Sequence, residues 1–368
     1  MGPLAGLKVV ELAGLGPTPF CGMLLGDLGA DVLRVDRLSE VDLGIEMPGR
    51  FDLRNRNKRS VALDIKSPEG LQTLLALIEK ADILIEGFRP GVAERLGVGP
   101  EACLQRNPRL VYGRATGWGQ DGPMSQMAGH DINYIALTGA LDLIGPPEGP
   151  PVPPLNLLGD YGGGGVYMAF GLMAAVHEST RSGKGQVVDC AMVDGVTSLL
   201  TVFHAFRQIG QLAPRRGANV LDGGAPFYRC YETSDGGHVA IGCIEKRFYD
   251  AMLAVLQLDP GELPDRGDRA NWPALCSRFE EIFRRRTRDE WSALFEGTDA
   301  CFSPVLTLDE AGRHPHNRAR ALIAEVDGVQ QPQPTPRFSR TPGEIARAAP
   351  HRGAHTQEVL TEWGIATT

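Results

Sequence analysis

The segment GLKVVELAGLGPTPFCGMLLGDLGADVLRVDR, residues 6–37, decides the fold. Its pattern predicts a buried strand over 7–12, a helix over 19–29 and a second strand over 31–37. The alternation continues along the chain, with strands expected at 60–67, 82–88 and 110–119 and a helix over 67–81. Strands that alternate with helices predict an α/β fold with a mostly parallel, Rossmann-like sheet flanked by helices.

The second half of the chain has a different pattern of apolar and polar residues, which predicts a smaller α+β domain. A Pro-rich stretch interrupts the first half at 146–156, and residues 226–243 have the pattern of a hairpin that turns at Asp235, Gly236 and Gly237. Amphipathic helices follow this hairpin. We therefore expect a large domain over 1–200 that is completed by the C-terminal segment 325–368, a linker helix or loop over 200–225, and a small α+β domain over 225–324.

The composition excludes several classes of protein. The net charge of −8 over 368 residues argues against nucleic acid as a partner, and no apolar run is long enough for a membrane span. The beginning of the sequence lacks the pattern of a secretion signal. Seven cysteines lie singly, with no CxxC pair, which favours reduced thiols, a cytoplasmic location and no metal site.

A cluster of basic residues lies in GRFDLRNRNKRS, residues 49–60. It holds five cations: Arg50, Arg54, Arg56, Lys58 and Arg59. A charge run of this kind is usually a solvated loop. The alternative is a docking site for a small polyanion.

Several other cations are expected at one edge of the sheet. Arg37, Arg89 and Arg114 fall at or near the carboxyl ends of predicted strands, and Lys66 lies just past another. Ligands of parallel sheets bind beyond these ends. The first strand–turn–helix resembles a dinucleotide site only weakly, because Pro19 occupies the third glycine position of the motif. The same geometry suits other adenosine phosphates, including coenzyme A.

The stretch GHDINYIALTG, residues 129–139, places polar residues at the entrance of a predicted helix. His130 and Tyr134 are four residues apart and share one helix face, whereas the adjacent Asp131 points elsewhere and is a poor partner for His130. The free N–H groups at such a helix start can stabilise a developing oxyanion. A structural histidine is the alternative interpretation of His130.

Two further acidic residues and one loop are candidates for a site. Asp160 in LLGDYGGGGVY stands before four glycines, which indicate either close helix packing or a ligand passing near the carboxylate. Such a carboxylate can act as a base or a nucleophile. Glu245 follows the second strand of the hairpin, where a glutamate is ordinarily favoured by the helix dipole alone. The segment LDGGAPFY, residues 221–228, is either a tight turn or a mobile flap.

Eight segments of the chain together resemble the class III CoA-transferase superfamily. They are, in order, residues 6–37, EGFRPGV, TGWGQDGP, GHDINYIALTG, LLGDYGGG, GKGQVVDCAMVDG, LDGGAPFY and PRFSRTPGE, spread over residues 4–345. The chain is most similar to the α-methylacyl-CoA racemase branch, since the histidine of GHDINY marks that branch. Transferases of the superfamily instead use the aspartate of GDYGGG as a nucleophile.

The resemblance implies a role for each matching residue. His130 and Asp160 would flank the α-carbon of a 2-methylacyl-CoA, and Glu245 would orient His130. Arg37, Leu63, Lys66 and Arg89 match positions that hold the adenosine and phosphates of CoA. The superfamily forms an interlocked homodimer whose small-domain residues complete the partner's site. The resemblance therefore implies that Glu245 can act in trans, with action in cis as the alternative.

The expected function is epimerisation of 2-methylacyl-CoA thioesters by 1,1-proton transfer through an enolate. Inversion at carbon requires a proton removed from one face and another delivered to the opposite face, and His130 and Asp160 are two groups of different type suited to this. No redox cofactor or metal is expected, because CoA enters as part of the substrate. The alternatives are a CoA-transferase with Asp160 as nucleophile and a non-catalytic acyl-CoA-binding protein.

Overall fold

The computed structural model of the chain describes residues 2–39, 44–45 and 47–365. The chain folds into two compact units. The large unit comprises Met1–Thr138, Pro154–Leu200 and Arg318–Thr368, and the small unit comprises Gly139–Pro153 and Thr201–Asn317. The division differs from the expected one at its edges: residues 201–225 and 139–153 group with the small unit, and residues 318–324 with the large unit.

The large unit is built on a six-stranded parallel sheet with the strand order β3-β2-β1-β4-β5-β6. The strands are β1 (Lys8–Leu12), β2 (Asp31–Asp36), β3 (Lys58–Ala62), β4 (Ile83–Glu86), β5 (Val111–Thr116) and β6 (Gln186–Ala191). The order reverses between β1 and β4, which is the topological switch point of a doubly wound sheet. The predicted α/β class and parallel sheet are confirmed.

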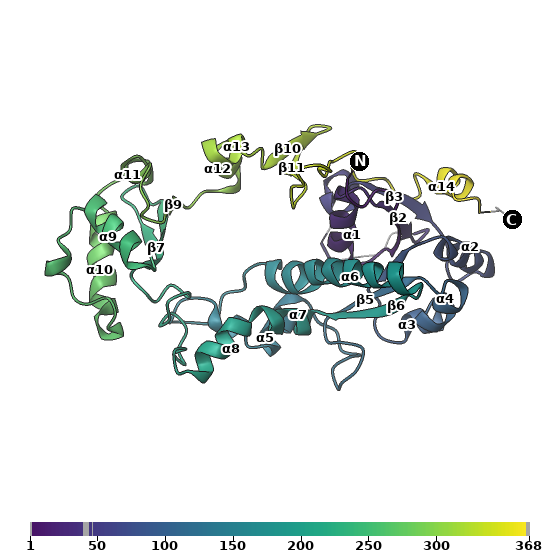
Figure 1. Cartoon of the computed structure of the whole chain (residues 1–368), viewed down its shortest axis with the longest axis horizontal. Coiled ribbons are helices and arrows are strands. Elements are labelled where there is room, and N and C mark those ends of the chain that lie inside the picture. The colour runs from purple at the N-terminus through teal and green to yellow at the C-terminus, as the bar shows by residue number, and fades with distance from the viewer. Residues whose placement is uncertain (1, 40–43, 46, 366–368) are drawn as a thin grey trace. The chain divides into compact units, whose positions relative to one another are not determined.

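Helices cover both faces of this sheet (Figure 1). The helices of the large unit are α1 (Pro17–Asp27), α2 (Pro68–Glu79), α3 (Val92–Arg95), α4 (Pro100–Arg106), α5 (Asp131–Leu137), a π-helix (Leu157–Val166), α6 (Tyr167–Ser182), α7 (Met192–Leu199) and α14 (Thr356–Glu362). The side chain of Ser67 accepts a hydrogen bond from the Gly70 N–H at the start of α2, which confirms the predicted N-cap. The hairpin β10 (Ile323–Val326) and β11 (Val329–Pro332) and the short helix α13 (Pro315–Ala319) lie in the C-terminal third.

The four central strands β1, β2, β4 and β5 bury apolar side chains on both faces of the sheet, so the large unit has two cores. Val10, Leu33, Leu84 and Tyr112 pack in a core with side chains of α2, α4 and α14. Their neighbours in the strands, such as Val9, Val32, Ile83 and Val111, pack in the other core with α1 and α6. Successive strand residues point to opposite faces, which explains why these strands are continuous apolar runs.

The C-terminal segment completes the large unit beside β3. His355 accepts a hydrogen bond from the Ser60 N–H at 3.2 Å, and Thr356 accepts one from the Ala62 N–H at 3.2 Å. Trp363 is buried in the core on that face. The edge strand β3 is thereby covered rather than exposed to solvent.

The small unit holds an antiparallel sheet with the order β7-β8-β9. Its elements are α8 (Thr201–Gln208), β7 (Tyr228–Glu232), β8 (His238–Gly242), α9 (Lys246–Val255), α10 (Trp272–Phe283), α11 (Arg288–Phe295), β9 (Phe302–Pro304) and α12 (Leu308–Arg313). The strands β7 and β8 pair as the predicted hairpin. In the segment 221–228 the Asp222 carboxylate accepts hydrogen bonds from the N–H groups of Gly217, Asn219 and Gly224, which favours the interpretation as a tight turn.

The described part of the chain offers neither a membrane-spanning helix nor a cluster of metal ligands. No helix there is both long and apolar enough to cross a membrane. No group of three or more His, Cys, Asp or Glu side chains in the same part of the chain is arranged to hold a metal ion.

Candidate active site

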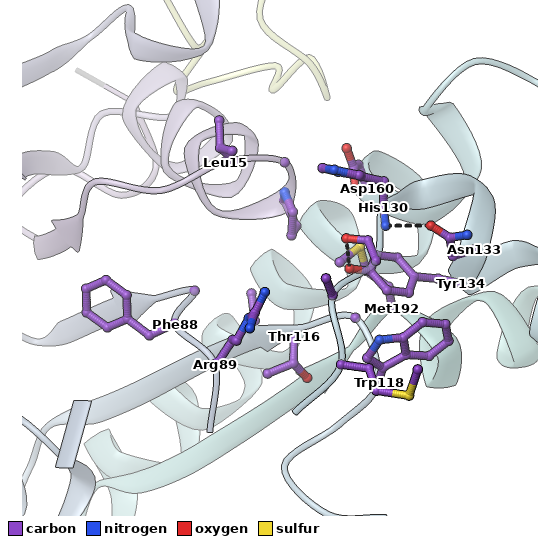
Figure 2. A pocket seen from close by; sticks show the side chains of 18 of the residues that line it. Leu15, Phe88, Arg89, Thr116, Trp118, His130, Asn133, Tyr134, Asp160 and Met192 are labelled. Atoms are coloured by element: carbon purple, nitrogen blue, oxygen red, sulfur yellow. Dashed lines mark hydrogen bonds between the residues drawn. The ribbon is translucent and has the colours of Figure 1, made fainter. Parts of the chain in front are cut away.

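A pocket of about 560 Å³ lies at the switch point of the sheet (Figure 2). Its walls come from the segments that follow three neighbouring strands: residues 15–18 after β1, 87–90 after β4, and 115–118 at the end of β5. The start of α5, Asp160 of the π-helix and Met192 close the remaining sides. The pocket therefore occupies the place where doubly wound sheets bind their ligands.

His130 lies at the mouth of this pocket as the N-cap of α5. Its backbone N–H donates to the Asn133 side chain at 3.0 Å, and its carbonyl accepts from the Asn133 N–H at 2.8 Å. The residue is exposed. These bonds fix the backbone of His130 while leaving its imidazole at the pocket surface (Figure 2).

Tyr134 lies behind His130 and closes the wall of the pocket. Its hydroxyl donates to the carbonyl of Gly129, and its ring packs edge-on against Trp118 with the centroids 4.7 Å apart. Burial raises the pKa of the Tyr134 phenol to about 12. Tyr134 is therefore a neutral packing and hydrogen-bonding group that supports the loop before His130.

Asp160 lines the pocket from the first turn of the π-helix. Asn156 donates to one carboxylate oxygen at 3.1 Å. The other lies against Gly16, where a Cβ atom would sit 3.1 Å from it. Burial raises the pKa of the Asp160 carboxyl, and the charge of Asp131 adds to this, whereas the Asn156 hydrogen bond and the charges of His130 and Arg54 oppose it. A carboxyl group in this environment is suited to exchange a proton.

Asp131 turns its side chain away from His130. Its carboxylate accepts hydrogen bonds from the N–H groups of Gly159 and Asp160 at 2.6 and 2.7 Å. It is buried, with 6 % of its surface exposed. Asp131 is thus bonded to the backbone of the segment that carries Asp160, as expected for a residue that is not the partner of His130.

The positions expected to bind CoA gather at the carboxyl edge of the sheet. Arg37 follows β2, Leu63 and Lys66 follow β3, and Arg89 follows β4 and lines the pocket. Arg37, Lys66 and Arg89 are exposed, and the described part of the chain gives none of their side chains a hydrogen bond or ion pair. Three cations without a partner in the described part of the chain therefore lie where a polyphosphate ligand of such a sheet would bind.

Both sequence-based interpretations of the basic cluster 49–60 are wrong for three of its five cations. Lys58 and Arg59 belong to β3, which begins two residues earlier than expected. Arg56 pairs with Asp27 at 2.5 Å, Lys58 with Glu11 at 2.7 Å, and Arg59 with Asp31 at 2.5 Å, and all three cations are buried. They are structural ion pairs, neither solvated nor free to bind an anion.

Three other cations expected in the basic cluster or at the sheet edge, Arg50, Arg54 and Arg114, contact side chains of the protein. Arg54 pairs with Asp52 at 2.7 Å, and the exposed Arg50 stacks over the Phe51 ring at 4.5 Å. Arg114 is buried and pairs with Glu86 and Glu94, each at 2.8 Å. Arg114 is therefore not available to a ligand.

Glu245 lies in the small unit as the N-cap of α9. The backbone just before it is held by Arg266, which donates to the carbonyls of Cys243 at 3.2 Å and Ile244 at 2.9 Å. The guanidinium also stacks over the rings of Phe227 and Tyr249, 4.8 and 4.5 Å from their centroids. The place of Glu245 is thus well fixed within its own unit, while its role beside His130 stays a prediction.

Three of the four glycines after Asp160 (Gly163, Gly164 and Gly165) serve close packing. A Cβ atom on Gly164 would lie 2.8 Å from Pro17 of α1, and one on Gly163 would lie 2.7 Å from Val196 of α7. From the opposite side, a Cβ atom on Gly195 would lie 1.9 Å from the carbonyl oxygen of Gly163. The π-helix is thereby wedged between two helices, and this wedge holds Asp160 at the pocket.

Gly195→Ala is expected to destabilise the large unit by about 1–3 kcal/mol or more, because the added methyl group forces α7 away from the π-helix. Urea denaturation followed by circular dichroism measures the change. Gly312→Ala is the matched control, since no atom lies within 4 Å of its Cβ position in α12, and there we expect no loss. Equal stability of Gly195→Ala and the unmodified chain would contradict the wedge.

Three polar or small residues of the site had no role assigned from sequence. Asn156 precedes Asp160 by one helical turn, and Asn133 stands at the third position of α5, where a capping side chain is common. Gly16 has a positive φ of 62°, which lets the turn after β1 approach Asp160. The spacing of the two asparagines from Asp160 and His130 was the one local signal that could have identified them.

Comparisons with known proteins agree with the geometry. The sequence profile of CoA-transferase family III matches residues 4–356. The chain is 47 % identical over 364 residues to alpha-methylacyl-CoA racemase of Mus musculus, with 98 % of this chain and 93 % of the relative covered. It is 43 % identical over 367 residues to alpha-methylacyl-CoA racemase of Homo sapiens, with 98 % and 94 % covered.

The fold agrees as well. A crystal structure of a CAIB/BAIF family protein from Brucella suis superposes with a TM-score of 0.85 at 28 % identity, covering 98 % of this chain and 99 % of that one. The family predicted from the eight ordered motifs is thus confirmed over nearly the whole length. The chain belongs to CoA-transferase family III.

Proposed function

We propose that this chain interconverts the R and S epimers of 2-methylacyl-CoA thioesters by 1,1-proton transfer. The observation that carries the proposal is the presence of His130 and Asp160 in one pocket at the switch point of the sheet. The identity of 47 % to a relative named alpha-methylacyl-CoA racemase supports the same reaction. The chain would then be an isomerase that acts on an acyl-CoA.

In the proposed mechanism His130 and Asp160 lie on opposite faces of the substrate α-carbon. One of them removes the α-proton of a given epimer, and the other delivers a proton to the opposite face, so their roles reverse with the configuration of the substrate. The raised pKa of Asp160 supports this use, because its carboxyl group then holds a proton more readily than an ordinary carboxyl group and can deliver it to the substrate.

The intermediate of this reaction is an enolate, whose oxygen requires stabilisation. A thioester α-hydrogen is only weakly acidic, so a base alone does not suffice. The free N–H groups at the start of α5, beginning with that of Asp131, are the donors we propose for this oxygen. The reaction moves protons only, so we propose that it needs no redox cofactor or metal and that CoA enters as part of the substrate.

The CoA moiety is proposed to bind along the carboxyl edge of the sheet. Arg37, Lys66 and Arg89 would contact its phosphates, and Leu63, which packs beside the core, would contact the adenosine. The three cations are exposed and have no hydrogen-bond or ion-pair partner among the described residues, which supports this assignment. We propose no nucleic-acid partner, because the chain carries a net charge of −8.

The test is α-hydrogen exchange in deuterated water with a small panel of acyl-CoA thioesters. We expect incorporation of deuterium at the α-carbon together with interconversion of the epimers. Saturable binding of acyl-CoA without exchange of its α-hydrogen would contradict the proposal and indicate a non-catalytic acyl-CoA-binding protein. Trapping of Asp160 by hydroxylamine in the presence of acyl-CoA would instead favour the alternative, an acyl-CoA:carboxylate CoA-transferase in which Asp160 is the nucleophile.

We further propose that the chain acts as an interlocked homodimer in the cytoplasm. The large unit exposes several large apolar side chains that a partner subunit would cover, among them Leu137, Leu155, Leu157 and Phe170, at 62 %, 75 %, 57 % and 73 % exposure. The seven cysteines are free thiols, which fits a reducing compartment. Sedimentation analysis and cell fractionation test the two parts of this proposal.

Mixing two inactive variants tests whether Glu245 acts in trans. If it does, hybrid dimers of His130→Ala and Glu245→Ala contain one site with both residues intact, and activity returns on mixing. If Glu245 acts in cis, every site of the hybrid lacks one residue and no activity returns. The measurement is epimer interconversion before and after subunit exchange, with each variant alone as the control.

A further inference from the structure

We propose that the Asp131 carboxylate is a positioning group for the proton transfer: it holds the segment that carries Asp160 in place beside His130 and adds negative charge to the site. The inference rests on the proposed function of His130 and Asp160. It assigns a role to the side chain of Asp131, separate from the role of its backbone N–H.

The carboxylate joins the two elements that carry the bases. Asp131 is the first residue of α5, and His130 is the N-cap of that helix. One oxygen of Asp131 accepts from the N–H groups of both Gly159 and Asp160, at 2.6 and 2.7 Å. The side chain of Asp131, the residue that follows His130, is therefore bonded directly to the backbone of Asp160.

The first turn of the π-helix explains why an anion is favoured there. The N–H groups of the first residues of a helix have no partner within the helix. Gly159 and Asp160 are the third and fourth residues of the π-helix, and the buried Asp131 supplies their acceptor. Bonds from N–H groups to a carboxylate are stronger than bonds to a neutral acceptor, so the segment is held firmly.

The absence of a side chain at Gly159 makes room for this contact. A Cβ atom on Gly159 would lie 2.5 Å from the bonded oxygen of Asp131 and 2.8 Å from its carboxyl carbon. Any side chain there would displace the carboxylate. The glycine therefore belongs to the positioning contact, unlike Gly163 and Gly164, which pack against neighbouring helices.

The second oxygen of Asp131 is buried and has no hydrogen-bond partner among the described residues. Its charge is therefore only partly balanced, and it raises the pKa of Asp160 beyond the effect of burial. The other charged or titratable groups that act on Asp160 are His130, Arg54 and Tyr134. Among the described charged groups that act on Asp160, Asp131 is the one that is also bonded to the backbone of that residue.

Three variants separate position from charge. Asp131→Asn keeps an acceptor oxygen for the two N–H groups and removes the charge. Asp131→Ala removes both, and Gly159→Ala keeps the charge while displacing the carboxylate. Asp289→Asn, which removes an aspartate that is 92 % exposed in the small unit, is the control for loss of one negative charge.

The expected results differ among these variants. For Asp131→Ala and Gly159→Ala we expect kcat for epimer interconversion to fall about 100-fold, the lower end of what a positioned base contributes, with little change in KM. For Asp131→Asn we expect the pKa of Asp160, measured by ¹³C NMR of its labelled carboxyl in the free protein, to fall. The control should leave kcat and the titration of Asp160 unchanged.

The outcomes are decisive in both directions. A wild-type kcat in Asp131→Ala and Gly159→Ala would overturn the positioning role, and an unmoved titration of Asp160 in Asp131→Asn would overturn the role of the charge. Because the NMR titration needs no substrate, it decides the second point even if Asp131→Ala does not fold. Absence of exchange by the unmodified chain would refute the proposed function and leave the titration result standing.

Discussion

Asp160→Asn is expected to abolish the interconversion of 2-methylacyl-CoA epimers, with kcat reduced by about 10²–10⁴-fold or more. The amide has nearly the same shape as the carboxyl group but neither accepts nor delivers a proton at neutral pH. With one of two opposed groups removed, a proton can still leave and return on the face of His130, but the configuration cannot invert. Chiral separation of the epimers after reaction in deuterated water measures both events.

His130→Ala should give the mirror-image result. The face served by Asp160 retains exchange, the face served by His130 loses it, and interconversion stops in both directions. A CoA analogue should bind both variants as it binds the unmodified chain, because the cations proposed to hold CoA lie on the loops after β2, β3 and β4. Full racemase activity of Asp160→Asn would exclude a two-base mechanism.

Much of the fold follows from the sequence because its signals are local. The residues of α2 show their N-cap, first-turn proline and apolar period within a single segment, and the hairpin shows its turn at Asp235, Gly236 and Gly237. The separation of His130 from Asp131 was predicted from the directions of adjacent helical residues, but in the structure His130 is the N-cap of α5, with an extended backbone, and only Asp131 belongs to the helix. Such rules need no knowledge of what lies across the fold.

The partners of buried charges could not be predicted in this way. Lys58 meets Glu11 across 47 positions in the chain, and Asp131 meets Gly159 and Asp160 across 28 and 29 positions. A run such as RNRNKR looks the same whether its cations face water or a carboxylate on the neighbouring strand. Only the strand order, which sets β3 beside β2 and β2 beside β1, decides between the two.

Lys58→Met is expected to destabilise the large unit by about 3–5 kcal/mol, because it leaves the Glu11 carboxylate buried without a cation. Neither side chain has any exposed surface, and the ammonium group also donates to the carbonyl of Pro19 at 2.9 Å in the first turn of α1. Burial raises the pKa of Glu11 and lowers the pKa of Lys58, so each depends on the other to remain charged. Native-state hydrogen exchange of the β1 and β3 amides measures the loss within the large unit.

The double variant Lys58→Met/Glu11→Leu should recover most of this loss, because two apolar side chains of similar volume need no compensation for buried charge. Lys246→Met is the surface control: Lys246 pairs with Asp250 at 2.6 Å but is 81 % exposed, and its replacement should change stability by less than about 0.5 kcal/mol. If Lys58→Met were as mild as Lys246→Met, the buried pair would not be what holds β3 and the first turn of α1 to β1. In that case the pocket wall formed by residues 15–18 would owe its position to apolar packing alone.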